Sequence, residues 1–297
     1  MKPVIGKINR VICFGDSYTE GEGSNLELTS QIVKLYKDQP SEGRKIIHSI
    51  NNKGSWPYFL SKLTNSYMQN EGQYAANNND IFNKVFEVDK WAKFGPRDIV
   101  VVMWSSSIRD KLPYIADLFA ENGPIGLGWS LSELSTKETE TQFVKRYYSE
   151  DINKEKKEYL ESTLVPFYKE YFKKFMTTLY TDDYYDNINL NYVYQLQEYF
   201  KFKKTNYLFI DGFESMNSFS EKNSKKWDII DKDHYWNFGK ETAWSFLNEL
   251  KKDVFEDPKL THNMTNAKLH PNMEGYRIIG KQIFNHFADS ILKPSAI

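Results

Sequence analysis

Two side chains near opposite ends of the chain are of the types needed for nucleophilic catalysis. Ser17 follows an apolar run in VICFGDSYTEGEG (residues 11–23), and His270 stands in KLHPNMEGYRIIG (residues 268–280). A serine hydroxyl becomes a strong nucleophile when a base such as histidine takes its proton. Pro271 presets the first turn of the helix expected after His270, so the histidine has a fixed neighbour. Together the two residues predict acyl transfer through a covalent serine intermediate.

Both residues also have structural explanations. Serine and aspartate often cap helices by accepting backbone N–H bonds, so Ser17 could simply close a strand-to-helix turn. His270 could cap the last helix. A second histidine, His234, has an aspartate three residues before it in DKDH, but it lacks the H-P-x-x-x-G-Y pattern that begins at His270. We therefore rank His270 above His234 as the base.

The elements that must position Ser17 and His270 follow from the apolar pattern. Strands are predicted from short apolar runs at residues 10–14, 98–104 and 206–211, with a weaker one near 73–76. Amphipathic helices are predicted over residues 55–68, 78–91 and 273–292. Such alternation indicates a mostly parallel sheet covered on both faces. Functional groups collect at the carboxyl ends of parallel strands, and Ser17 follows one of these ends.

Capping residues and apolar stripes support these helices. Ser55 is the expected N-cap of the first helix, which has Pro57 in its first turn. Asn77 or Asn78 is the expected N-cap of the second helix. The first helix should bury one face made of Trp56, Phe59, Leu60, Leu63 and Tyr67. The last should bury Tyr276, Ile279, Ile283, Phe287 and Ile291.

The chain is predicted to be a single domain over residues 1–297. Residues 110–205 are too long for one crossover, and we interpret them as a helical insertion or lid over the carboxyl edge of the sheet. Their Gly123–Gly128 stretch is a candidate mobile part. The predicted fold class is therefore α/β: a three-layer α/β/α, flavodoxin-like sandwich with a mostly parallel sheet and a large helical insertion.

The sequence resembles the SGNH, or GDSL-type, hydrolase family. FGDSYTEGEG matches the first family block and HPNMEGYRIIG the last, H-P-[N/D]-x-x-G-Y. YAANNNDIFNKV falls where the glycine block belongs, and DIVVVMWSSS falls where the strand before the G-x-N block belongs. The resemblance covers most of the chain outside the insertion, and marks the chain as a divergent member.

The resemblance implies roles for individual residues. Ser17 would be the nucleophile and His270 the general base. The oxyanion hole would use the N–H of Ser17, the N–H of Ala75 at the glycine position, and Ser106 or a neighbouring serine where the family has asparagine. Asn78 could supply an amide instead. The family's aspartate three residues before the histidine is Ala267 here, so the acid partner is open.

Four further residues are candidates for substrate binding: Asp16, Tyr18, Trp104 and Ser105. We also expect Asp16 to bond backbone groups in the turn that holds Ser17. No metal site and no cofactor are predicted.

Composition excludes several classes of protein. The net charge of −1 gives no basic surface for nucleic acid. No apolar run is long enough for a transmembrane helix, and no secretory signal is evident in MKPVIGKINR. The single cysteine, Cys13, is expected in the core. We expect a cytoplasmic protein, or a virion protein if the sequence is phage-encoded; the sequence leaves the oligomeric state open.

The favoured function is a serine esterase that removes a small acyl group from a glycan or similar small-molecule ester. The chain has 20 tyrosines and 7 tryptophans, some of which could stack on sugar rings. An acyltransferase would use the same serine with a sugar hydroxyl in place of water. A catalytically weak glycan-binding or structural module, for example on a phage particle, is the non-enzymatic alternative.

Overall fold

The computed structural model describes residues 8–24, 40–73, 76–105, 154–159, 161–162, 166, 170, 182–213, 227–236, 242–250, 253–255 and 270–288. Its strands are β1 (Arg10–Gly15), β2 (Tyr67–Gly72), β3 (Asp98–Trp104) and β4 (Asn206–Asp211). Its helices are α1 (Ser17–Glu20), α3 (Pro40–Asn52), α4 (Trp56–Thr64), α5 (Asn78–Ala92), α9 (Lys154–Tyr159), α11 (Asp182–Lys203), the 3-10 helix η4 (Lys232–His234), α13 (Ala243–Glu249) and α14 (Met273–His286). Within these ranges no helix has the length and apolar character needed to cross a bilayer.

The strands form one parallel sheet in the order β2-β1-β3-β4. This is the strand order of the flavodoxin-like doubly wound folds. A single parallel bridge between Phe209 and Tyr235 extends the sheet beside β4. The predicted α/β class with a mostly parallel sheet is confirmed.

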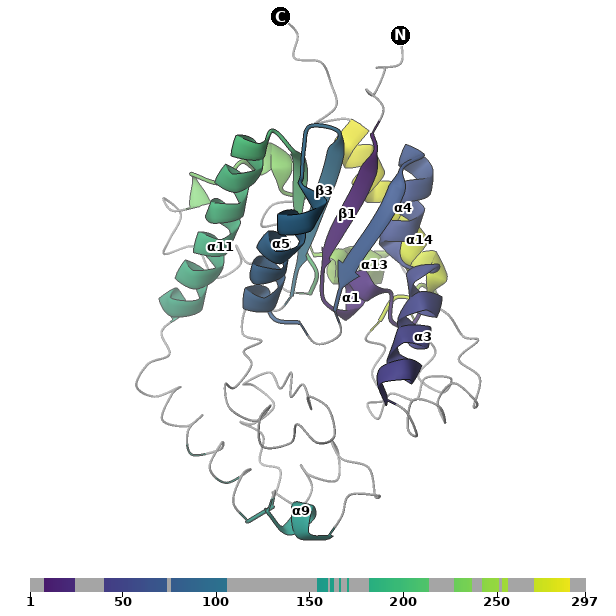
Figure 1. Cartoon of the computed structure of the whole chain (residues 1–297), viewed down its shortest axis with the longest axis vertical. Coiled ribbons are helices and arrows are strands. Elements are labelled where there is room, and N and C mark those ends of the chain that lie inside the picture. The colour runs from purple at the N-terminus through teal and green to yellow at the C-terminus, as the bar shows by residue number, and fades with distance from the viewer. Residues whose placement is uncertain are drawn as a thin grey trace, which may run out of the picture.

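Helices cover both faces of the sheet, which makes a three-layer sandwich (Figure 1). On one face, α4, α13 and α14 pack against side chains that include Val11, Cys13 and Met103. On the other, α5 and α11 pack against side chains that include Phe14, Val102 and Phe209. Cys13 is buried, as its apolar neighbours predict. Burial on both faces explains the nearly continuous apolar runs of β1, β3 and β4.

The predicted starts of the amphipathic helices are confirmed, but the predicted core face of the first helix is only partly right: Trp56 and Leu60 are buried, whereas Leu63 is 45% exposed. Ser55 caps α4 and Asn77, rather than Asn78, caps α5. The last helix buries Tyr276, Ile279, Ile283 and Phe287, while Ile291 lies outside the described residues.

Two boundaries were predicted wrongly around β2. The helix expected over residues 55–68 ends at Thr64, because Asn65 adopts a left-handed conformation with φ 50° and closes its last turn. Tyr67 therefore starts β2 and is 70% exposed instead of lying on the buried helix face. The strand expected near residues 73–76 has ended by Gly72, and Gln73 follows it.

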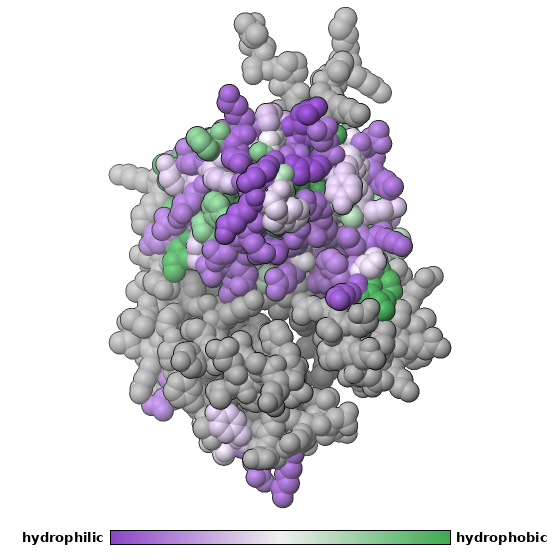
Figure 2. Space-filling view, in the orientation of Figure 1, coloured by the Kyte–Doolittle hydropathy of each residue, from purple (hydrophilic) through white to green (hydrophobic). Residues whose placement is uncertain are grey.

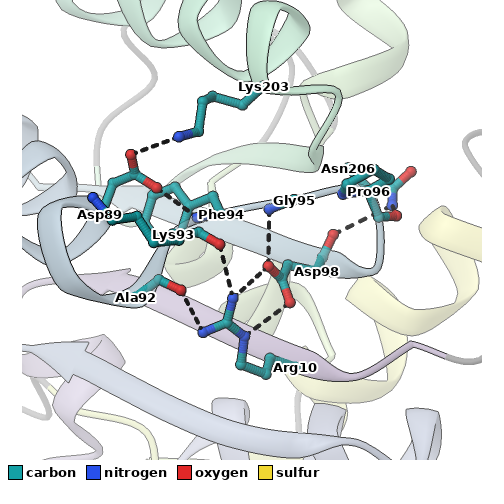
Figure 3. Close-up of polar contacts among 10 residues, drawn as sticks. All are labelled: Arg10, Asp89, Ala92, Lys93, Phe94, Gly95, Pro96, Asp98, Lys203 and Asn206. Carbon is teal, nitrogen blue, oxygen red and sulfur yellow. Dashed lines mark hydrogen bonds and ion pairs between the residues drawn. The ribbon is translucent and has the colours of Figure 1, made fainter.

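Paired charges close the amino-terminal edge of the sheet (Figure 3). Arg10 of β1 donates to both carboxylate oxygens of Asp98 in β3, at 2.9 and 2.6 Å, and to the carbonyls of Ala92 and Lys93. These bonds tie the end of α5 to two neighbouring strands.

A second cluster lies beside the first and joins α5 to α11. Asp89 accepts from the Phe94 N–H, from Tyr199 Oη and, at 2.9 Å, from Lys203 Nζ. Burial alone would raise the pKa of Asp89, but these three hydrogen bonds outweigh it and hold the pKa below its ordinary value of 3.8. The amino edge is thus stabilised by several partners for each charge.

The predicted insertion over residues 110–205 contains one element of the sandwich itself. The α11 side chains Leu190, Val193, Leu196 and Phe200 are buried in the core beneath α5 and β4. The helix is therefore a crossover helix that leads into β4. Gly123–Gly128 lies outside the described residues, so a lid over the sheet edge stays a prediction.

The described surface is mainly hydrophilic on the face shown in Figure 2, with hydrophobic side chains in separate small patches. Exposed large apolar residues such as Trp91 and Phe202 are scattered over different elements. Single exposed apolar residues are normal on a folded surface.

Candidate active site

A sharp turn joins β1 to α1 and presents Ser17. Asp16 is the N-cap of α1, and its Oδ1 accepts from the Tyr18 N–H at 3.0 Å. A Cβ on Gly15 would lie 2.1 Å from Thr19 Oγ1 and 2.9 Å from the Met103 carbonyl oxygen, so only glycine allows the helix to fold back this tightly. Because Asp16 is the cap, Ser17 is not, and the capping explanation of the serine is wrong.

His270 directly precedes the segment that begins α14. The N-cap of α14 is Asn272, whose Oδ1 accepts from the Gly275 N–H at 3.0 Å. The Asn272 N–H in turn donates to the Val254 carbonyl at 2.9 Å. An antiparallel bridge between Phe255 and Pro271 adds a second attachment. The backbone beside His270 is therefore held in place, and the capping explanation of this histidine is also wrong.

The fold brings Ser17 and His270 into contact. His270 Nε2 lies 3.0 Å from Ser17 Oγ, although 253 positions separate them in the sequence. Both residues are buried, at 4% and 7% exposure. The centroid of the Tyr18 ring lies 5.7 Å from that of the imidazole and 4.2 Å from that of the Phe213 ring. A hydroxyl and an imidazole nitrogen at this distance can exchange a proton.

A carboxylate that the sequence analysis did not select lies at the same nitrogen. Glu22 Oε2 is 3.3 Å from His270 Nε2. The acid of a Ser-His-Asp triad faces the other ring nitrogen, Nδ1. Glu22 lies between Gly21 and Gly23, which both adopt positive φ, and the sequence carries no signal that assigns it to the histidine.

A buried polar network lies behind Ser17. Asp16 Oδ2 accepts from Ser105 Oγ at 2.8 Å, so the ends of β1 and β3 are joined. Asn78 Oδ1 accepts from the Ser105 N–H at 2.8 Å, while Asn78 Nδ2 donates to the Ser105 carbonyl and to Asn189 Oδ1. The network therefore also links α5 and α11 to the turn that carries Ser17.

The predicted oxyanion-hole residues have different outcomes. Ser17 is the first residue of α1, where backbone N–H groups have no partner within the helix. Both hydrogens of the Asn78 amide are used within the protein, so Asn78 would have to turn before it could serve an oxyanion. Ala75 and Ser106 lie outside the described residues, and their roles stay predictions.

The four predicted substrate-binding residues are all buried. Asp16, Tyr18, Trp104 and Ser105 have at most 1% exposure. Asp16 and Ser105 bond each other, Tyr18 packs beside His270, and Trp104 packs beside Phe209. These contacts position the site from within, and a direct substrate contact by any of them stays a prediction.

His234 lies at the opposite edge of the sheet from Ser17. Its ring stacks on Tyr207, near the amino end of β4, with centroids 4.3 Å apart. Its Nδ1 is 3.0 Å from Asp231 Oδ2. His234 and Asp231 of the DKDH segment therefore pair with each other, away from Ser17.

Comparisons with known proteins give distant likenesses to solved structures. No protein-family model and no curated protein matches the chain. A solved structure of a G-D-S-L family protein from Desulfitobacterium hafniense aligns over 94% of this chain and 99% of that chain, at 11% identity and a TM-score of 0.41. A solved structure of a lipolytic G-D-S-L family member from Veillonella parvula aligns over 94% of this chain and 98% of that chain, at 12% identity and a TM-score of 0.39.

Proposed function

We propose that this protein is a serine esterase that removes a small acyl group, such as acetyl, from a glycan or a similar ester. The observation that carries the proposal is the 3.0 Å contact between His270 Nε2 and Ser17 Oγ. The resemblance of FGDSYTEGEG and HPNMEGYRIIG to SGNH hydrolase blocks supports it, because those blocks hold the same two residues.

The reaction follows from this pair. Ser17 Oγ attacks the ester carbonyl carbon while its proton moves to His270 Nε2. The bond to the leaving alcohol then breaks, and the alcohol takes the proton from Nε2. Water next attacks the acyl-enzyme and gives a proton to Nε2. The carboxylic acid departs, and Ser17 Oγ recovers the proton.

The negative oxygen that develops on the substrate needs hydrogen-bond donors. The Ser17 N–H at the start of α1 is one, and we propose the Ala75 N–H and the Ser106 hydroxyl as the others. Losing one such donor costs about 3 kcal/mol of barrier. A serine hydroxyl in place of the family's asparagine has a shorter reach, so we expect a modest turnover rate.

Burial around Ser17 favours a small acyl group. Ser17 is 4% exposed. The ring of Tyr18, the next residue, packs against Phe213 and Tyr276. We therefore expect a small acyl group such as acetyl to fit better than a long chain.

The test is ester turnover by purified wild-type protein, Ser17→Ala and a control, Ser66→Ala. Ser66 is bonded to Thr64 Oγ1 and lies in the link between α4 and β2. Nitrophenyl acetate, butyrate and octanoate and an acetylated oligosaccharide serve as substrates. We expect the acetyl esters to react fastest, a loss of about 10³-fold or more in Ser17→Ala, and no change in Ser66→Ala. Equal rates for wild type and Ser17→Ala would remove the serine from the mechanism.

The same assay separates the alternatives. With a glycan acceptor added, an acylated glycan formed at the expense of free acid would identify an acyltransferase. Glycan binding without turnover of any ester would identify a binding module.

A further inference from the structure

Glu22 is placed to act on the histidine of the site. Its Oε2 is 3.3 Å from His270 Nε2, the nitrogen that also faces Ser17. The Glu22 side chain is 22% exposed, and its Oε2 atom is buried. The carboxylate therefore interacts with the imidazole where solvent screening is reduced.

The backbone of Glu22 is fixed on both sides. Its N–H donates to the Ser17 carbonyl at 3.1 Å, and its carbonyl accepts from Tyr276 Oη at 2.6 Å. Gly21 and Gly23 flank it with φ of +95° and +81°. A Cβ on Gly21 would lie 2.6 Å from Ser55 Cβ, so this turn requires glycine for both conformation and space. The turn thus links α1, α14 and the carboxylate in one arrangement.

A carboxylate beside Nε2 favours the protonated ring. When His270 takes the proton of Ser17, Nε2 gains a hydrogen and a positive charge next to Glu22 Oε2. Opposite charges at this separation attract strongly in a partly buried site. In the neutral state, by contrast, the nitrogen lone pair faces a negative oxygen.

We propose that Glu22 is a positioning residue for the esterase reaction: its carboxylate stabilises the imidazolium that forms when the His270 ring takes the proton of Ser17. This inference rests on the proposed function, because Glu22 affects catalysis only if Ser17 and His270 carry out the esterase reaction. It assigns to Glu22, at Nε2, the electrostatic part that the missing aspartate at position 267 would play at the other nitrogen.

Two other described side chains, Tyr18 and Ser17, contact the ring. Within the described part of the chain, the Tyr18 ring packs beside the imidazole, and the Tyr276 hydroxyl is bonded to the Glu22 carbonyl. Both phenols are neutral near pH 7. Ser17 contributes a neutral hydroxyl. Among these groups Glu22 is the carboxylate beside the imidazole.

The experiment compares wild-type protein with Glu22→Gln and with Glu274→Gln as a matched control. Glu274 is also an acid close to His270 in sequence, but it is exposed on α14 and paired with Arg277. NMR of isotope-labelled histidine gives the titration midpoint of His270, assigned with His270→Gln. The pH dependence of kcat/KM and the separate kcat and KM for an acetyl ester are measured on the same three proteins.

For Glu22→Gln we expect the His270 midpoint and the acid limb of the kcat/KM profile to move down by about one pH unit or more. We expect kcat to fall about 10-fold with KM nearly unchanged, because the lost interaction acts on the protonated ring. Glu274→Gln should match wild type. An unchanged His270 midpoint in a folded Glu22→Gln protein overturns the inference.

The resting-state titration needs no turnover, so the two proposals can fail separately. A shifted midpoint in a protein without esterase activity would reject the esterase and keep the contact between Glu22 and His270. Normal esterase activity with an unchanged His270 midpoint would keep the esterase and reject the role of Glu22.

Discussion

The two ends of the same parallel strands use charge in opposite ways. At the amino edge, Arg10 donates two hydrogen bonds to Asp98 (Figure 3). Arg10 also donates to backbone carbonyls, and Asp98 also accepts from the Gly95 N–H. At the carboxyl edge, a hydroxyl and a carboxylate from Ser17 and Glu22 converge on one nitrogen of His270. Many partners for each charge fix a structure, whereas two groups at one proton-binding atom leave the proton able to move.

The comparison predicts that changes at the carboxyl edge act on activity and changes at the amino edge act on stability. Ser17 follows the end of β1 and Arg10 starts it, so one short strand connects the two regions. Variants at both ends can therefore be measured in the same protein with the same two assays, ester turnover and urea unfolding.

The largest expected effect is that of His270→Gln on turnover. Without the imidazole, the Ser17 proton has no base at 3.0 Å, and kcat/KM for an acetyl ester should fall about 10³-fold or more. The urea midpoint should change little. A variant that keeps most of its activity would show that this contact is not used in the reaction.

The next effect is that of Arg10→Met on stability. It leaves the buried Asp98 carboxylate without its arginine, and removing one partner of a buried pair is costly. Because Arg10 is itself 26% exposed, we expect a loss of about 2 kcal/mol in the free energy of unfolding. Turnover by the folded fraction should stay near wild type.

Arg277→Met is the matched control for Arg10→Met. Arg277 is 50% exposed and pairs with Glu274 on the same helix. Its removal should change the free energy of unfolding by less than about 1 kcal/mol. Equal losses of unfolding free energy in the two variants would mean that the Arg10–Asp98 pair stabilises the fold no more than an exposed surface pair does.

A smaller effect is expected for Tyr199→Phe. This change removes one hydrogen bond to Asp89 and keeps the ring that packs beside Phe86. The free energy of unfolding should fall by about 1 kcal/mol. Tyr194→Phe, at a 40% exposed position of the same helix, should have almost no effect in the same urea titration.

The smallest effect is on the pH dependence of stability. The pKa of Asp89 in the folded protein lies below its ordinary value of 3.8, so the unfolded chain binds the proton more readily. The stabilisation is therefore present above about pH 4 and is lost as the pH falls through the folded pKa. Urea midpoints between pH 6 and pH 3 should fall less steeply in Asp89→Asn. Parallel curves for the two proteins would contradict this assignment.

The sequence predicted those parts of the fold that depend on local pattern. The apolar runs of β1, β3 and β4 and the caps Ser55 and Asn77 are recognisable because burial and capping leave their mark on a few adjacent residues. The β2 strand is different. Its sequence YMQNEG is partly exposed at the edge of the sheet, and its register depends on pairing with β1.

The site shows the same limit. Ser17 and His270 could be selected because their residue types and flanking motifs are informative. Glu22 could not, because its role depends on how Gly21 and Gly23 fold the chain back and on the Tyr276 hydroxyl from α14. The bonds of Asn78 to Ser105 and Asn189 could not be predicted for a similar reason, since they form only in the folded sheet.

The most direct test of the central claim is covalent labelling by a fluorophosphonate, followed by peptide mapping, in wild type, His270→Gln and Arg10→Met. The claim is that Ser17 is a nucleophile activated by His270. It predicts a single labelled serine, Ser17, in wild type and in folded Arg10→Met, and labelling about 10³-fold slower in His270→Gln. Labelling at another serine, or at an equal rate without the imidazole, would contradict it.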